Sequence, residues 1–230
     1  MKKLALLFSF IFPAITTASA IPDLSQLKWK EIEDQDGIKT FEADVPGFSR
    51  PAFRAEAIIE SEISKVVSAI TDTNRRQEWT PNLKVSKIIQ PISKVEWVEY
   101  WQMTAPLVDD RDLVFSTGFD FDWSKKRLIV PFHSVDSPSS PKTKNVLAIV
   151  NAGSYVLWPT ENKSGTNIIY ECLFDFGGSV PGWFASSFQR SNPRKVLQGL
   201  RKQVNKSDIV SSPKIHLLFE DKVKKLADIF

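Results

Sequence analysis

Few residues of this chain have side chains that commonly carry out chemistry. The 230-residue sequence has two histidines, His133 and His216, and one cysteine, Cys172. One cysteine and two distant histidines do not form a zinc-ligand pattern. Gly177 and Gly178 precede a predicted helix, but they lack the lysine and the spacing of a phosphate-binding loop. The sequence therefore predicts neither a metal nor a nucleotide cofactor.

Aromatic and aliphatic residues alternate with other residues along three consecutive segments in the middle of the chain. This alternation is typical of strands with one buried face. The buried faces are predicted to hold Trp97, Trp101 and Met103, then Leu113, Phe115, Phe119 and Phe121, then Leu128, Val130 and Phe132. Glu99 and Thr117 share these faces, and a buried polar group without a partner is costly. Either residue therefore needs a specific polar partner, or, for Glu99, a strand end or bulge can return it to solvent.

The flanking segments complete an α+β pattern. A strand is predicted around residues 53–59, and a helix follows from Ser61 to about Asp72. Further strands are predicted at 146–150, 155–158 and 166–174. A last helix is predicted to begin near Pro181 and to kink at Pro193, with an apolar stripe along residues 196–204. One helix must then cover one face of a large antiparallel sheet.

The N-terminus has the composition of a secretory signal peptide. Lys2 and Lys3 precede an apolar run, and Ala18 and Ala20 suit cleavage after Ala20. We expect a signal peptide at 1–20, one domain at 21–206, and a tail at 207–230 that forms a short amphipathic helix, either packed on the body or in contact with a membrane. Loss of the two lysines leaves a formal charge near +1, which gives no electrostatic case for nucleic acid. The prediction is an exported, periplasmic or secreted monomer.

Four short motifs resemble a known family in order and spacing. They are Glu78-Trp79-Thr80-Pro81-Asn82-Leu83, Tyr100-Trp101, Asp110-Arg111-Asp112-Leu113-Val114, and the segment from Tyr170 to Trp183. Together they are similar to START (StAR-related lipid-transfer) domains of the phosphatidylcholine-transfer-protein kind, over about residues 29–206. The resemblance implies a helix-grip fold, in which a curved antiparallel sheet wraps a long C-terminal helix and encloses a hydrophobic tunnel for one lipid.

The resemblance implies that the inward faces and the start of the last helix bind the ligand. The expected ligand-binding residues are Trp97, Glu99, Trp101, Met103, Phe115, Thr117, Phe119, Val130, Phe132, Trp183, Phe184 and Phe188. Pro106, Leu107 and Val108 are expected to form either a moving lid or a static contact at the tunnel mouth. Arg111 is expected to hold this loop through local carboxylates, or to bind ligand. Many START domains have a basic residue where this chain has Thr117, which puts charge-paired ligand recognition there in doubt.

Three functions remain open from the sequence. The first is binding of a lipid or other apolar ligand for transfer, and the second is sensing of such a ligand with a signal to a partner through the tail. The third is an enzyme, because the wider helix-grip group includes cyclases that use the same cavity. Catalysis needs an acid or base inside the pocket, and His133 has the parity of an outward residue. Periodicity alone does not separate a cavity lining from a close-packed core.

Overall fold

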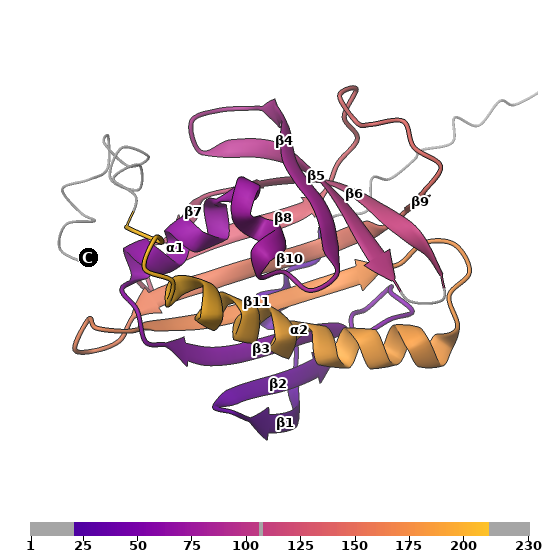
Figure 1. Cartoon of the computed structure of the whole chain (residues 1–230). Coiled ribbons are helices and arrows are strands. Elements are labelled where there is room, and N and C mark those ends of the chain that lie inside the picture. The colour runs from indigo at the N-terminus through magenta and orange to yellow at the C-terminus, as the bar shows by residue number, and fades with distance from the viewer. Residues whose placement is uncertain (1–20, 106–107, 212–230) are drawn as a thin grey trace, which may run out of the picture.

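The computed structural model describes residues 21–105 and 108–211, which fold around one large antiparallel sheet (Figure 1). The strands are β1 (Lys30–Gln35), β2 (Ile38–Ala43), β3 (Ala52–Ile59), β4 (Leu83–Pro91), β5 (Glu96–Ala105), β6 (Val108–Gly118), β7 (Asp120–Asp122), β8 (Arg127–Ser134), β9 (Val146–Leu147), β10 (Ile149–Pro159) and β11 (Thr166–Asp175). The helices are η1 (Leu24–Gln26), α1 (Ile63–Thr71), η2 (Thr73–Glu78) and α2 (Gly182–Val204).

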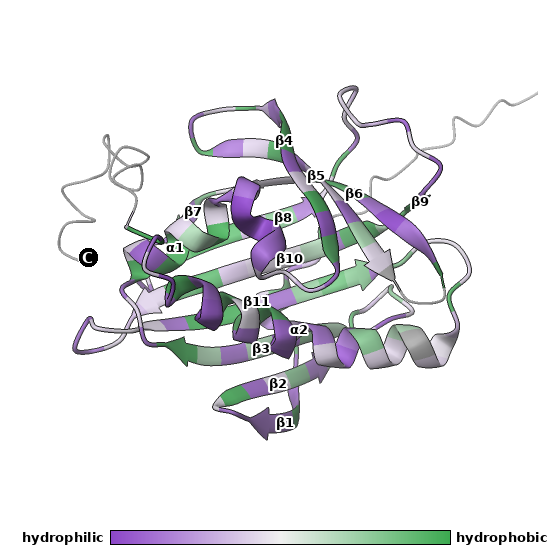
Figure 2. Cartoon of the chain, viewed as in Figure 1, coloured by the Kyte–Doolittle hydropathy of each residue, from purple (hydrophilic) through white to green (hydrophobic). Residues whose placement is uncertain are grey.

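The strand order is β1-β2-β3-β11-β10-β8-β6-β5-β4, with β7 beside β8 and the short β9 parallel to β6. The first three strands therefore join the sheet through β11, where Ala55 pairs with Tyr170. Hydrophobic and hydrophilic residues alternate along the central strands (Figure 2). This pattern gives the sheet one apolar face for α1 and α2 to cover.

Helix α2 lies across the sheet face at β2, β3 and β11 and also contacts α1 (Figure 1). The apolar stripe expected from the sequence is buried, with Leu197 and Leu200 fully inaccessible. Pro181 is the N-cap, so the helix begins one residue later than Pro181 itself, and Pro193 lies inside it. In the part of the chain that the structure describes, no helix has the length and apolar character needed to cross a membrane.

The second of the three central strands is shorter than the alternation predicted. Strand β6 ends at Gly118, where an added Cβ would lie 2.4 Å from the Val95 carbonyl oxygen. The main-chain N–H of Phe119 donates to the same carbonyl, at 2.9 Å. Phe119 therefore lies in the connection between β6 and β7, not in one continuous strand as expected, although its side chain still packs against the hydrophobic core that includes Phe121.

Candidate ligand-binding site

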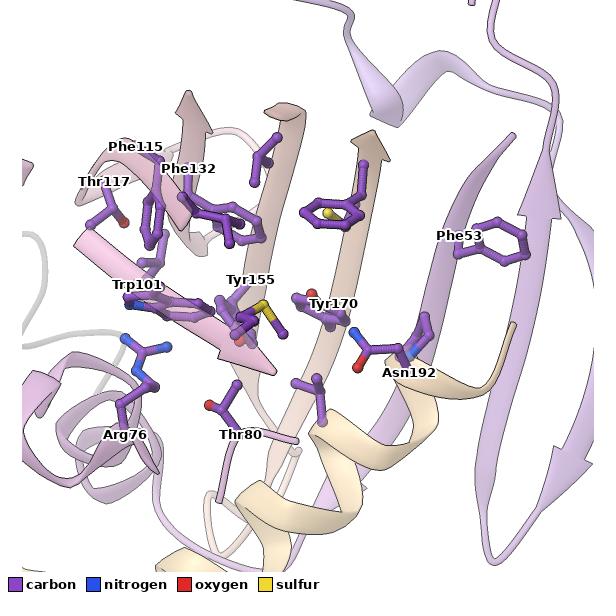
Figure 3. Close-up of a pocket in the computed structure, with 18 of the residues that line it drawn as sticks. Phe53, Arg76, Thr80, Trp101, Phe115, Thr117, Phe132, Tyr155, Tyr170 and Asn192 are labelled. Atoms are coloured by element: carbon purple, nitrogen blue, oxygen red, sulfur yellow. The ribbon is translucent and has the colours of Figure 1, made fainter. Parts of the chain in front are cut away.

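A cavity lies between the apolar face of the sheet and α2 (Figure 3). The cavity volume is about 80 Å³, and all the space between its walls, including the part that opens to solvent, is about 900 Å³. The walls come from β3, α1, η2, β5, β6, β8, β10, β11 and α2. They are formed by Phe53, Ile70, Arg76, Thr80, Trp101, Met103, Leu113, Phe115, Thr117, Val130, Phe132, Val150, Tyr155, Tyr170, Cys172, Phe174, Phe188, Gln189, Asn192, Pro193 and Val196.

Aromatic rings form a continuous wall across four strands. Trp101 meets Phe115 edge to face, with 5.0 Å between ring centroids and 88° between ring planes. Phe115 contacts Phe132 at 6.2 Å. Phe132 in turn stacks with Tyr170 at 6.1 Å and 19°. Rings in these arrangements support one another beyond simple burial, so the wall has a defined shape.

Several wall residues retain accessible surface although they lie in the middle of the sheet. Trp101, Met103, Phe132, Cys172 and Phe174 are only partly buried, while the neighbouring Leu113 is 2% exposed. Close-packed cores leave few voids larger than a water molecule. All five of these residues line the cavity, so the space beside them is not completely filled by packed side chains.

The cavity has a polar end, formed by η2 and the turn that follows it. Arg76 is 5% exposed, and its guanidinium lies 5.2 Å from the Trp101 ring centroid and 5.1 Å from that of Trp79. One terminal nitrogen, Nη2, donates to the Ile70 carbonyl oxygen, but Nε has no hydrogen-bond partner among the described residues. The hydroxyl of Thr80, nearby in Figure 3, is also buried and unpartnered. A cation and a hydroxyl are thus available at this end.

The other ionisable groups of the cavity wall are held neutral. Burial raises the pKa of the Cys172 thiol to about 12. Burial also raises the pKa of Tyr155 to about 12, although the nearby Arg76 opposes this shift. The pKa of Tyr170 is raised well above its ordinary value, chiefly by burial. Apart from Arg76, the described wall is therefore uncharged at neutral pH.

The structure brings seven of the expected ligand-binding residues together in the cavity wall. These are Trp101, Met103, Phe115, Thr117, Val130, Phe132 and Phe188. The Thr117 hydroxyl donates to the Pro131 carbonyl oxygen at 2.9 Å, which satisfies its buried polar group within the sheet.

Four expected residues, Trp97, Glu99, Phe119 and Trp183, do not line this cavity. The Trp97 and Phe119 rings contact each other, with 5.9 Å between their centroids. Glu99 is 0% exposed and bound by neighbouring side chains, so it neither lines the cavity nor returns to solvent. Trp183 is 68% exposed in the first turn of α2. Pro106, Leu107 and the side chain of Phe184 lie outside the described residues.

Arg111 holds main-chain carbonyl groups, and not the carboxylates expected from the sequence. It is 3% exposed; its Nε donates to the Phe176 carbonyl oxygen at 3.2 Å, and its Nη1 donates to that of Asp109. The first bond joins β6 to the segment that leads into α2. Arg111 and the half-buried Val108 are both absent from the cavity wall.

The sequence analysis did not predict the polar end of the cavity or the part of its wall on β10 and β11. Tyr155, Tyr170 and Cys172 lie on strands that were expected, and the same alternation, extended to those strands, could have placed them. No sequence pattern predicts that Arg76 is buried, because it lies beside Arg75 in the polar segment Thr73–Glu78. Arg75 binds Glu78 and Asp208 at the surface, whereas Arg76 is buried.

An open, curved antiparallel sheet closed by one C-terminal helix over a cavity defines the helix-grip fold. The model of the START domain family matches residues 18–208. The chain therefore belongs to the START domain family.

Solved structures share this fold. A STAR-related lipid transfer protein from Xanthomonas axonopodis is 24% identical, with a TM-score of 0.68 over 77% of this chain and 99% of that one. Human StAR-related lipid transfer protein 5 is 19% identical, with a TM-score of 0.71 over 76% of this chain and 86% of that one. Among curated proteins, the uncharacterized protein PA1579 of Pseudomonas aeruginosa is 24% identical over 180 residues, which cover 77% of this chain and 87% of that protein.

Proposed function

We propose that this protein binds one lipid or similar apolar molecule in its internal cavity, with an anionic group of the ligand at Arg76. The apolar part would lie against the aromatic wall, where each Å² removed from water contributes about 25 cal/mol. A phospholipid, as the resemblance to phosphatidylcholine-transfer-like members implies, has a phosphate for this position. The names of the lipid transfer proteins that share the fold support the same ligand class.

The observation that carries the proposal is the unpartnered guanidinium nitrogen of Arg76. An isolated buried charge costs several kcal/mol unless another group pairs with it. Arg76 forms no ion pair with any carboxylate of the described residues. Its side chain interacts with the Ile70 carbonyl oxygen and with Tyr155, but its Nε has no hydrogen-bond partner among the described residues. A phosphate or carboxylate accepts charge-assisted hydrogen bonds from a guanidinium. A bound anion would therefore satisfy Arg76.

The cavity favours binding over catalysis. Acid–base catalysis needs a group that exchanges protons near the working pH. The described wall contains no histidine, aspartate or glutamate, and the pKa values of its cysteine and tyrosines are raised away from neutrality. Among residues 21–105 and 108–211, no cluster of His, Cys, Asp and Glu could hold a metal ion.

The test compares a charged and an uncharged form of one probe. cis-Parinaric acid and its methyl ester share an apolar chain and differ in the carboxylate. We expect the wild type to prefer the acid and Arg76→Gln to lose this preference while it still binds the ester. Arg127→Gln is the matched control, because Arg127 stacks on Trp158 at 4.0 Å but does not line the cavity. If the wild type and Arg76→Gln show the same preference for the acid over the ester, the polar-end assignment is refuted. If the wild type binds neither probe, lipid binding itself is contradicted.

We further propose that the protein is exported, with Ile21 as its mature N-terminus, and acts as a monomer without nucleic acid. The order of basic, apolar and small residues in 1–20 supports export. Intact mass of the secreted protein checks the cleavage site. Size-exclusion chromatography with light scattering checks the monomer.

The proposed use of the bound lipid is transfer or sensing, with transient contact between a membrane and the exposed Trp183. Transfer between donor and acceptor vesicles would support carriage. Ligand-dependent capture of a partner protein would support sensing. Native mass spectrometry of protein from its own export compartment would identify the ligand.

A further inference from the structure

Glu99 is a fully buried carboxylate outside the cavity wall, and it accepts hydrogen bonds from three side chains. Its Oε1 accepts from the Trp97 indole N–H at 2.8 Å and from the Thr73 hydroxyl at 3.0 Å, and its Oε2 accepts from the Trp101 indole N–H at 2.7 Å. No lysine or arginine among the described residues forms an ion pair with it. Glu99 is thus bound entirely by neutral donors.

These bonds reach β5, which carries Trp101, and η2, which carries Arg76. Trp101 is on β5, lines the cavity, and presents its ring face to Arg76. Thr73 is the first residue of η2, the 3₁₀ helix that carries Arg76. Side chains at positions i and i+3 of a 3₁₀ helix lie on the same side, and Thr73 and Arg76 are both 5% exposed. The bond from Thr73 to Glu99 therefore fixes the rotation of η2 that directs Arg76 inward.

We propose that Glu99 is a positioning residue for the anion subsite: it holds Trp101 and η2 in the arrangement that presents Arg76 to the ligand. This inference rests on the proposed function, because it assigns Glu99 a role in the charge preference of that cavity. A carboxylate suits the role, since both of its oxygens accept hydrogen bonds and indole N–H groups only donate. Glutamine has the same shape but would direct an NH₂ group at one of the donors.

The negative charge of Glu99 and its proposed positioning role have opposite effects on the affinity for an anionic ligand. Glu99→Gln removes a negative charge from the neighbourhood of Arg76, so electrostatics alone would strengthen binding of an anion. Positioning predicts that binding weakens. We expect Glu99→Gln to bind cis-parinaric acid at least threefold more weakly than the wild type, with little change for the methyl ester.

Thr73→Val tests positioning without any change of charge. Valine matches threonine in shape and cannot donate to Glu99, and neither Thr73 nor Glu99 lines the cavity. We expect Thr73→Val to bind cis-parinaric acid more weakly than the wild type, as Glu99→Gln does. Thr73→Ser keeps the hydroxyl, so we expect it to bind the acid as the wild type does. Indole ¹H–¹⁵N spectra supply a separate readout: the Trp97 and Trp101 signals should shift in Glu99→Gln, and the Arg127→Gln spectrum should match the wild type.

The outcomes separate this inference from the function on which it rests. If Arg76→Gln abolishes the preference for the acid while Thr73→Val and Glu99→Gln retain it, the role of Glu99 is refuted and the proposed function stands. Stronger binding of the acid by Glu99→Gln would also refute positioning. If the wild type shows no preference for the acid, both proposals fail. Should Glu99→Gln not fold, the comparison of Thr73→Val with Thr73→Ser decides.

Discussion

Gly153 on β10 lies directly beneath the ring of Phe132 on β8. The two residues are register partners, and a Cβ on Gly153 would lie 2.2 Å from the nearest atom of that ring. The missing side chain therefore lets Phe132 lie close to the sheet. Phe132 is a member of the aromatic wall, so this contact helps set the depth of the cavity.

Gly153→Ala should push the Phe132 ring into the cavity. The expected cost in unfolding free energy is about 1 to 3 kcal/mol, as for other overpacked sites, together with weaker binding of cis-parinaric methyl ester. Urea unfolding and ester titration measure the two effects. Gly182→Ala is the control, since a Cβ there meets no atom within 4 Å. Undiminished ester binding by Gly153→Ala would show that Phe132 moves away from the cavity instead.

Stability should fall at alkaline pH because Cys172 is held as a thiol. Its pKa rises from 9.0 to about 12 on folding, chiefly through burial, so the folded state retains a proton that the unfolded state loses. The contribution of the neutral Cys172 thiol to the free energy of unfolding is intact below about pH 9. It is lost as pH rises toward 12, by at most about 1.4 kcal/mol per pH unit. Urea unfolding between pH 8 and 10 measures this slope below the ordinary pKa of tyrosine. In Cys172→Ala the unfolding free energy should depend less on pH over this range. If the slope is unchanged, other groups cause it.

Arg111→Gln should destabilise the fold without a direct effect on ligand choice. Loss of the guanidinium removes its hydrogen bonds to the Phe176 and Asp109 carbonyl oxygens, and loss of hydrogen bonds made by a buried charged group costs about 1 to 3 kcal/mol. Arg127→Gln, at the stacked site beside Trp158, should cost less than about 1 kcal/mol. Thermal unfolding of both variants measures the difference. Equal melting temperatures would mean that water replaces the Arg111 contact.

Gly199→Ala distinguishes helix propensity from packing. Propensity alone predicts a gain of about 1 kcal/mol for alanine in a helix. A Cβ at Gly199 would instead lie 2.1 Å from the Trp79 carbonyl oxygen, a backbone atom with little freedom to move. We expect a net loss of stability in urea unfolding, and a gain would show that α2 can move away from the turn at Trp79.

The alternation of residue types predicted much of the cavity wall because side chains on a strand alternate between faces. It placed Trp101, Phe115 and Phe132 on one surface, and they meet there. The same rule treated Phe119 as part of this strand, but β6 ends at Gly118; the Phe119 side chain packs against the core and does not line the cavity.

The polar end could not be predicted by parity, because it belongs to no strand. Arg75 and Arg76 are adjacent and chemically identical, and only the 3₁₀ turn of η2 separates a surface ion pair from a buried cation. Glu99 had the right parity to face inward, yet the indole N–H groups of its neighbours at i−2 and i+2 bind its carboxylate. Tertiary contacts decided both positions.

The pairing of β3 with β11 also bears on how the chain folds as it is synthesised. Ala55 is made long before its partner Tyr170, and α2, which closes the cavity, is made later still. Contacts so distant in sequence slow folding, because a long loop must close first. The edge of β3 therefore stays unpaired until β11 is available, and the cavity is complete only once α2 has formed. A ligand can be enclosed only after that point, so enclosure requires the whole domain.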